Sequence, residues 1–355
     1  MKKTTGLCAA LTVALASGAA SSQYVQLADL PTINGGDGTI LISGTIVGDT
    51  GFAMLSGSGL QRIVKIEDLG GANIVSELTS TAALNTALGE VPSGISGTLL
   101  ASGSDLIILE NTTDQIVKID QMTGAASLLV DDTTLDGLPG VSGAATVSFG
   151  DVNPTTGNVF FYEGDTDSVY EVTGTNAVSV VLSDTELASI TGDDTPGGLG
   201  VDGSGVLYFG QSTSPENVSF FDPSDMSSGT LITEADVLAA QGSGTDIGIS
   251  STAFTVLSDG SVVFANTGTP DNFVSFDPAD PAGTLAIVLS EAELLAGPAA
   301  VDAAIAFSEF DGEVAWFNLS AAGGGVPGIY AVPEPTTAAL LGLGGLAMMR
   351  RRRSA

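Results

Sequence analysis

The sequence predicts an all-β fold, a six-bladed β-propeller of four-stranded blades closed by an N-terminal strand, with short capped helical turns between blades. Three observations lead to this fold class. A strand-like segment recurs six times, a second apolar run precedes most copies, and residues typical of tight turns come before those runs. Four short strands in a repeat of roughly 50 residues are typical of a propeller blade, whereas a β-helix needs much shorter coils.

The recurring segment alternates apolar and polar residues, as in Ile63–Glu67 and Ile116–Asp120. Its six copies begin, at intervals of 49 to 56 residues, at Ile63, Ile116, Val169, Val218, Phe273 and Ile329. This period is too long for a helical solenoid. We expect the segment to be the third strand of each blade.

A second apolar run lies ten to fifteen residues before most of these copies. The runs begin at Leu106, Val159, Val206, Val262 and Val314. Their β-branched and aromatic residues predict buried second strands. Turn sequences such as Asp202–Gly205 come before them and favour hairpins, and small-residue segments further upstream, such as Gly97–Ser102, suit a crowded innermost strand.

Fourth strands are predicted over Val178–Leu182 and Thr284–Leu289. Each is followed by a Ser-x-x-Glu sequence, Ser183–Glu186 and Ser290–Glu293, which we expect to cap a short helix. The last repeat ends at its third strand, and Tyr24–Leu30 resembles the missing fourth. We therefore predict that this N-terminal strand closes the ring and leaves only short outer edges exposed.

The N-terminal end predicts a secretory signal peptide over residues 1–22. A basic start, Met1–Lys3, precedes a ten-residue apolar run, Leu7–Ala16, and then small residues suited to cleavage. As a helix this run would span about 15 Å, half the hydrocarbon core of a bilayer, so we do not expect a permanent anchor here. The propeller is expected over residues 23–331.

The C-terminal end has three parts in a fixed order. A Pro-Glu-Pro triplet is followed by a short apolar stretch over residues 338–349 and then by four arginines. The residues of the signal are Pro333, Glu334, Pro335, Arg350, Arg351, Arg352 and Arg353. Over residues 332–355 the chain resembles the PEP-CTERM sorting domain, which implies a substrate of the membrane transpeptidase exosortase. The alternative is an ordinary C-terminal anchor with incidental prolines.

The physical chemistry of these parts suits that resemblance. The two prolines keep the triplet extended and non-helical, so a processing enzyme can reach it. The apolar stretch is short for a membrane span, but arginines that reach the cytoplasmic headgroups could hold it transiently as a transmembrane helix.

The body between the two ends is almost entirely acidic. The 355-residue chain carries 41 acidic and 9 basic residues, and only Arg62, Lys65 and Lys118 of the basic residues lie outside the ends. Between Gln23 and Val332 there are 40 acidic and three basic residues, a formal charge of −37. We therefore do not expect nucleic acid or anionic lipid as partners. Bound cations or salt would relieve the self-repulsion, although solubility alone also explains such a charge.

The catalytic residue types available to the body are few. The chain has no histidine, and its one cysteine, Cys8, lies in the segment expected to be removed. This composition excludes Ser/His/Asp and Cys/His triads and zinc sites built on histidine or thiolate. We do not expect an enzyme, and only carboxylate or metal chemistry remains as an alternative.

Aligning the second strands places one column of residues directly after them: Glu110, Glu163, Gly210, Asn266 and Asn318. Their oxygens could converge on one face of the propeller, and calcium prefers such hard donors. The body resembles propellers of the NHL and gluconolactonase type, which implies a cation or sugar site on that face. The other interpretation is that these residues end strands and begin turns through local hydrogen bonds.

Together these patterns predict an exported protein of the cell surface or extracellular matrix, processed by signal peptidase and exosortase, whose propeller is a non-catalytic binding or structural module. Extracellular polysaccharide and divalent cations are the other expected partners. No cofactor is predicted, and calcium is left open. The alternative function is a calcium-dependent propeller hydrolase or lactonase, in which channel carboxylates activate water through the metal.

Overall fold

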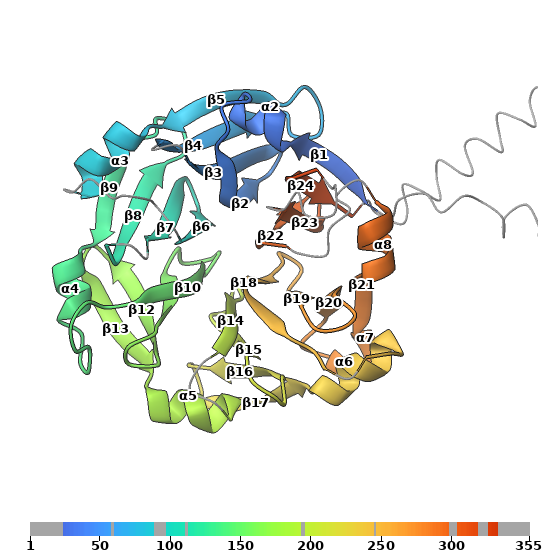
Figure 1. Cartoon of the computed structure of the whole chain (residues 1–355). Helices are drawn as coiled ribbons and strands as arrows, with labels where there is room; N and C mark the ends of the chain where they lie inside the picture. The colour runs from blue at the N-terminus through green and yellow to red at the C-terminus, as the bar shows by residue number, and fades with distance from the viewer. Residues whose placement is uncertain are drawn as a thin grey trace, which may run out of the picture.

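Six four-stranded antiparallel sheets surround a central channel in the computed structural model of the chain (Figure 1). The structure describes residues 24–57, 60–88, 97–110, 113–192, 196–244, 246–297, 304–318 and 326–332. The predicted six-bladed propeller is confirmed.

Each blade is a sheet whose strands follow one another from the channel to the rim. Blade 1 contains β2 (Ile40–Val47), β3 (Thr50–Gly57), β4 (Leu60–Glu67) and β5 (Ile74–Thr79). Blade 2 contains β6 (Gly97–Ser102), β7 (Asp105–Glu110), β8 (Gln115–Asp120) and β9 (Ala126–Val130). Blade 3 contains β10 (Val147–Val152), β11 (Val159–Glu163), β12 (Ser168–Gly174) and β13 (Ala177–Leu182).

The remaining blades repeat this order, except that the last takes its outer strand from the N-terminus. Blade 4 contains β14 (Pro196–Val201), β15 (Leu207–Gln211), β16 (Val218–Asp222) and β17 (Ser227–Ile232). Blade 5 contains β18 (Ile249–Val256), β19 (Val262–Asn266), β20 (Asn272–Phe276) and β21 (Ala286–Ser290). Blade 6 contains β22 (Ala306–Phe310), β23 (Glu313–Asn318), β24 (Gly328–Ala331) and β1 (Val25–Asp29).

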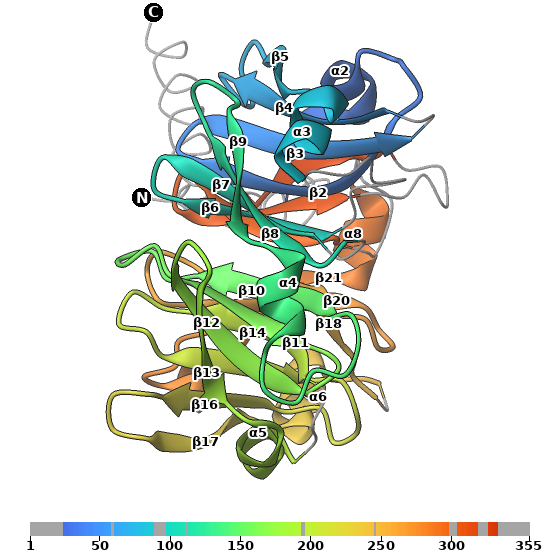
Figure 2. The same cartoon turned by 90° about the vertical axis from the view of Figure 1, so that its left-hand side faces the viewer.

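Short helices lie on the outer rim, most of them where one blade passes to the next (Figures 1 and 2). They are α2 (Leu30–Asn34), α3 (Thr81–Leu88), α4 (Asp132–Asp136), α5 (Asp184–Thr191), α6 (Glu234–Gln241), α7 (Pro281–Thr284) and α8 (Glu291–Ala296). The predicted Ser-x-x-Glu capping boxes begin α5 and α8, and Thr233 with Asp236 forms a third at α6. One boundary was wrong, because Thr284 ends α7 and the fourth strand of blade 5 begins at Ala286.

The ring closes as predicted. β1 pairs antiparallel with β24, with Val25 opposite Ala331 and Asp29 opposite Gly328. The N-terminal strand therefore becomes the outer strand of blade 6 and joins the first and last segments of the propeller.

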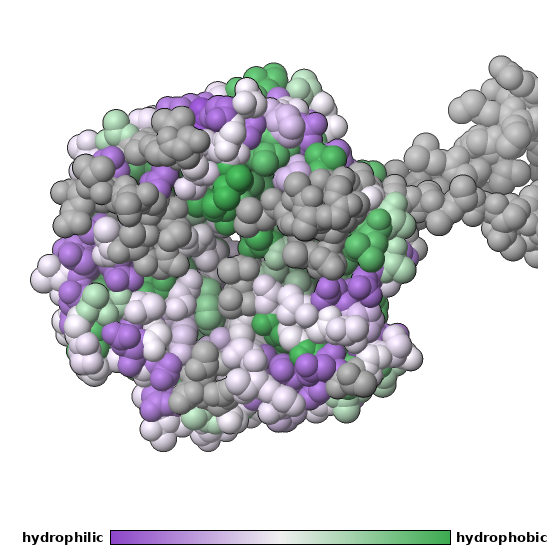
Figure 3. Space-filling view, in the orientation of Figure 1, coloured by the Kyte–Doolittle hydropathy of each residue, from purple (hydrophilic) through white to green (hydrophobic). Residues whose placement is uncertain are grey.

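The apolar core is divided among the seams between blades. Six clusters of buried side chains each combine residues of two adjacent blades. The predicted core aromatics belong to them, since Trp316 and Phe161 are 1% and 0% exposed. Figure 3 shows many of the hydrophilic residues around the rim of one face, and hydrophobic residues closer to the channel.

Small residues in the inner strands let neighbouring blades approach closely, as expected. A Cβ added to Gly44 of β2 would lie 2.2 Å from the ring of Phe317 in blade 6, and one added to Gly198 of β14 would lie 2.7 Å from Phe254 in blade 5. Neither side chain is the movable end of a flexible group, so a larger residue at either position would push two blades apart.

Candidate functional site: the central channel

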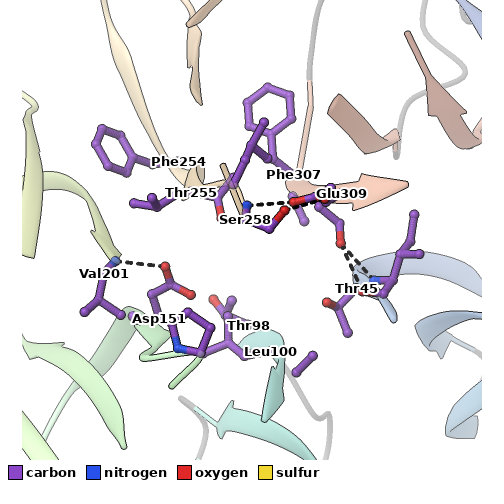
Figure 4. Close-up of a pocket in the computed structure, with 18 of the residues that line it drawn as sticks. Thr45, Thr98, Leu100, Asp151, Val201, Phe254, Thr255, Ser258, Phe307 and Glu309 are labelled. Carbon is purple, nitrogen blue, oxygen red and sulfur yellow. Dashed lines mark hydrogen bonds between the residues drawn. The ribbon is translucent and has the colours of Figure 1, made fainter. Parts of the chain in front are cut away.

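One residue from each inner strand lies at the same level around the channel. Strand register pairs these residues with equivalent positions of the six second strands. The six channel residues, called the channel ring here, are Thr45, Leu100, Asp151, Gly200, Thr255 and Ser308. Five of them, together with Val201 next to Gly200, line a cavity of about 450 Å³, within the usual range for a small-molecule site (Figure 4).

The inner strands present backbone N–H groups to this channel, and side chains of neighbouring blades accept hydrogen bonds from several of them. Ser308 Oγ of blade 6 accepts from Ile46 N of blade 1 at 2.9 Å. Ser43 Oγ of blade 1 accepts from Leu99 N of blade 2, also at 2.9 Å. The polar side chains of the inner strands thus hold adjacent blades together.

Asp151 is the charged member of the channel ring. It lies near the end of β10, just before the turn that Asn153 begins by accepting hydrogen bonds from Thr155 N and Thr156 N. Its Oδ2 accepts from Val201 N of blade 4 at 3.0 Å (Figure 4), and its Oδ1 accepts from Val152 N at 2.8 Å. The carboxyl group therefore joins blades 3 and 4.

Burial raises the pKa of Asp151 to about 7, although the two backbone hydrogen bonds favour the ionised form. The side chain keeps partial exposure to the channel. A carboxyl group with a pKa near neutrality can accept or donate a proton at physiological pH, which is the property required of a general base or acid.

Besides Asp202, which also lines the cavity, Glu309 supplies a carboxylate to the channel. It accepts hydrogen bonds from Ser258 N and Ser258 Oγ, both at 2.7 Å, and so ties blade 6 to the first hairpin turn of blade 5. The rest of the lining includes the hydroxyl groups of Thr98 and Thr155 and the rings of three phenylalanines. The channel therefore offers oxygen acceptors, hydroxyl groups and aromatic edges, without a basic side chain.

Sequence reasoning did not single out Asp151 or Glu309. The equivalent ring residues lie seven to nine positions before their second-strand partners, because the first turns differ in length among blades. An alignment on the second strands alone cannot place them. One feature of the sequence could have identified both residues. Each is an acidic residue at the end of an inner strand, shortly before a turn sequence.

The predicted column lies elsewhere, at the turns between second and third strands. Glu110 Oε2 accepts from Thr113 N and Thr113 Oγ1 at 2.7 and 2.6 Å. Glu163 Oε2 accepts from the equivalent N and Oγ1 of Thr166 at 2.8 and 2.6 Å, and its Oε1 accepts from Asp165 N and Thr146 N. Both carboxylates are fully buried and hold their own hairpin turn.

The amide members of the column are also buried. Asn266 Oδ1 accepts from Gly248 N and Gly268 N at 2.8 and 3.0 Å, and its Nδ2 donates to Pro270 O. Asn318 is 0% exposed. In blade 4 the prediction of Gly210 was one residue off, because Val218 pairs with Gly210 as Ile116 pairs with Leu109 in blade 2, which places Gln211 in the column.

The structure does not bring the column to the central channel, because none of its members lines the cavity. Glu110 and Glu163 instead lie near Asp114 and Asp136, between blades 2 and 3. Burial raises the pKa of Asp114 to about 6, opposed by its hydrogen bond from Val147 N and reinforced by the neighbouring carboxylates. Whether the column binds a cation stays a prediction.

The predicted sorting residues, Pro333 to Pro335 and Arg350 to Arg353, lie outside the described residues, as does the apolar stretch between them. Within the part of the chain that the structure describes, no helix has both the length and the apolar composition needed to span a membrane.

Residues 331–353 match the family model described as the PEP-CTERM protein-sorting motif. The match begins at the last residue of β24, so the motif directly follows the closed ring. The motif implies export and exosortase-dependent processing at the membrane.

No curated protein matches this chain. Several solved structures resemble it at low identity. A chain of the nidogen/laminin complex is 11% identical, with 76% of this chain and 85% of that chain covered and a TM-score of 0.48. TolB from Acinetobacter baumannii is 13% identical, with 69% and 53% covered and a TM-score of 0.44. A protein from Lactobacillus plantarum is 11% identical, with 78% and 77% covered and a TM-score of 0.45. The fold assignment is based on the strand pairing and not on these structures.

Proposed function

We propose that this chain is an exported protein of the cell surface or extracellular matrix, that exosortase removes its C-terminal tail, and that its propeller is a non-catalytic binding or structural module. The sorting motif at residues 331–353 is the observation that carries the proposal. The motif adjoins a completed ring, since Val332 N still donates to Val314 O at 3.0 Å. Cleavage near Glu334 would remove no strand of the propeller.

The channel supports a binding role for the body. Its volume of about 450 Å³ suits a short saccharide or another small polyhydroxyl ligand. Hydroxyl groups and carboxylates line it, and the body carries a formal charge of −37, so the ligand would be neutral or cationic. Extracellular polysaccharide and divalent cations meet that requirement.

The intact mass of the mature protein tests the sorting step. We expect protein from cells that possess exosortase to end near the Pro333 to Pro335 triplet, and protein from cells that lack the enzyme to retain Arg350 to Arg353. Changing Glu334→Ala in cells with the enzyme is the matched control and should also leave the tail attached. Recovery of the four arginines on protein from both strains would contradict the proposal.

A hydrolase is the second candidate, and one observation favours it. Asp151 combines access to the channel with a pKa of about 7, which suits a general base. Against it stand the absence of histidine from the chain and the use of Asp151 and Glu309 as hydrogen-bond acceptors between blades.

Lactone hydrolysis by the purified chain, measured with and without added calcium, distinguishes the two functions. We expect the wild type to show no turnover above that of the Asp151→Asn variant, because the role of Asp151 is to join blades 3 and 4. Turnover that the wild type shows and Asp151→Asn loses, with both proteins folded, would replace the binding proposal by the enzymatic one.

A further inference from the structure

Three carboxylates meet on the face of the propeller that carries the turns between second and third strands, at the seam of blades 4 and 5. One carboxylate oxygen from each of Glu216, Glu234 and Asp246 lies within 4.8 Å of the other two. Glu216 directly precedes β16 in blade 4, Glu234 is the first residue of α6, and Asp246 lies in the segment that leads from α6 into blade 5.

Glu216 is the unusual member of this group. Its side chain is only 7% exposed, and its Oε2 is buried without a hydrogen-bond partner. Glu163, a fully buried glutamate, accepts four hydrogen bonds from nearby N–H and O–H groups. A buried carboxylate oxygen without any partner costs free energy, and a bound water or ion can remove this cost.

No basic side chain of the described residues is available to neutralise the group. Arg62, Lys65 and Lys118 lie in blades 1 and 2, where each pairs with carboxylates close by. The two charged groups next to Glu216, those of Glu234 and Asp246, are both negative. The seam of blades 4 and 5 therefore concentrates three acidic groups that the body of the chain cannot balance with its own cations.

Backbone hydrogen bonds hold the three segments in place. Asn217, next to Glu216, accepts from Glu234 N at 3.1 Å through its Oδ1 and donates its own N–H to Gln211 Oε1 at 3.1 Å. Asp246 forms an isolated bridge with Thr269 of the blade 5 hairpin turn. The carboxylates are thus positioned by a loop, by a helix start that is hydrogen-bonded to this loop, and by a bridged segment.

We propose that Glu216, Glu234 and Asp246 bind a divalent cation, with calcium as the ion that fits best. Calcium accepts hard oxygen ligands about 2.4 Å away, so oxygens on opposite sides of the ion lie about 4.8 Å apart. Magnesium requires a tighter octahedron with distances of about 2.1 Å. Ser214 Oγ, 3.5 Å from Glu234 Oε2, is placed to add a neutral ligand. The ion would fasten blade 4 to blade 5.

Calorimetric titration of the full chain with calcium chloride, after removal of metal by a chelator and at constant ionic strength, tests this site. We expect saturable binding and a higher melting temperature with calcium. Glu216→Gln and Asp246→Asn should each weaken binding at least about tenfold, because affinity depends on the number of charged ligands. Asp246 is exposed, so its substitution decides the outcome even where Glu216→Gln impairs folding.

Asp184→Asn is the matched control. Asp184 is the exposed first residue of α5, the position that Glu234 occupies in α6, and its substitution removes one negative charge outside the cluster. Calcium affinity should be unchanged in this variant. The proposal is overturned by the absence of saturable binding to the wild type, or by equal affinity in the wild type and Asp246→Asn, which would place any bound ion elsewhere.

Discussion

Asp151 shows how a single side chain serves the channel of this propeller. The strand nearest the channel has no neighbour on its inner side, so its N–H groups need acceptors from another blade. Asp151 supplies one to Val201 N, in the way that Ser43, Ser308 and Glu309 do at other seams. A hydroxyl group does this without charge, whereas the carboxylate in a partly buried site costs free energy when it is ionised.

The cost of that ionisation predicts a pH dependence. The pKa of Asp151 is about 7 in the folded protein and about 3.9 in an unfolded chain. Between these values the folded state keeps a proton that the unfolded state releases, so this group lowers the free energy of unfolding as the pH rises from about 4 to 7. The effect is absent below that range and constant above it.

We therefore expect Asp151→Asn to gain stability relative to the wild type as the pH increases. Between pH 5 and pH 8 the difference in free energy of unfolding should move toward the variant by about 2 to 3 kcal/mol. Urea denaturation at the two pH values measures this, with Asp184→Asn as the control for removal of an exposed charge. A difference that does not change with pH would show that Asp151 titrates as an ordinary exposed carboxyl group.

At the scale of elements, hairpins and capped helices were predictable because the residues that form them lie close together in sequence. The capping boxes Ser183–Glu186 and Ser290–Glu293 each need only four residues. The strand boundary at Thr284 was predicted wrongly because a short local turn, which the prediction did not consider, precedes the strand. Asp280 accepts from Gly283 N, and Thr284 Oγ1 donates to Asp280 O, which draws the residues after Asp-Pro into a helical turn.

The column at the ends of the second strands illustrates what a local pattern leaves open. Glu110 and Glu163 are each followed three residues later by a threonine, and this Glu-x-x-Thr pair closes the turn in both blades. A glutamate at the end of each second strand would also be expected if these side chains bound a ligand in the channel. Only the three-dimensional direction of the side chain decides between the two, and it depends on the pleat of a strand within a twisted blade.

At the scale of the whole molecule, the number of repeats in the sequence predicted the number of blades. The missing fourth strand of the last repeat predicted that the N-terminal strand closes the ring. Without β1, blade 6 would have three strands, and its pairing with β24 gives this blade the fourth strand that the other blades have. The cluster of Glu216, Glu234 and Asp246 could not be predicted, because its members are 18 and 12 residues apart and meet only when two blades are packed.

Tyr24 links the closing strand to the rest of the ring. Its side chain is 0% exposed, and its ring lies edge-on to Trp316 at 5.0 Å and to Tyr330 at 5.7 Å. Its hydroxyl group donates to Leu294 O in α8 at 2.7 Å. One residue next to β1 thus packs on blade 6 and reaches the helix that follows blade 5.

Removing this side chain tests whether closure stabilises the whole ring. We expect Tyr24→Ala to lower the free energy of unfolding by about 3 to 5 kcal/mol, because it leaves a cavity among aromatic rings. Tyr24→Phe, which loses only the hydrogen bond to Leu294 O, should cost about 1 kcal/mol. Trp316 is the only tryptophan of the chain and lies against Tyr24, so its fluorescence during urea denaturation reports directly on the closing seam. If Tyr24→Ala unfolds at the same urea concentration as the wild type, the pairing of β1 with β24 does not limit the stability of the propeller.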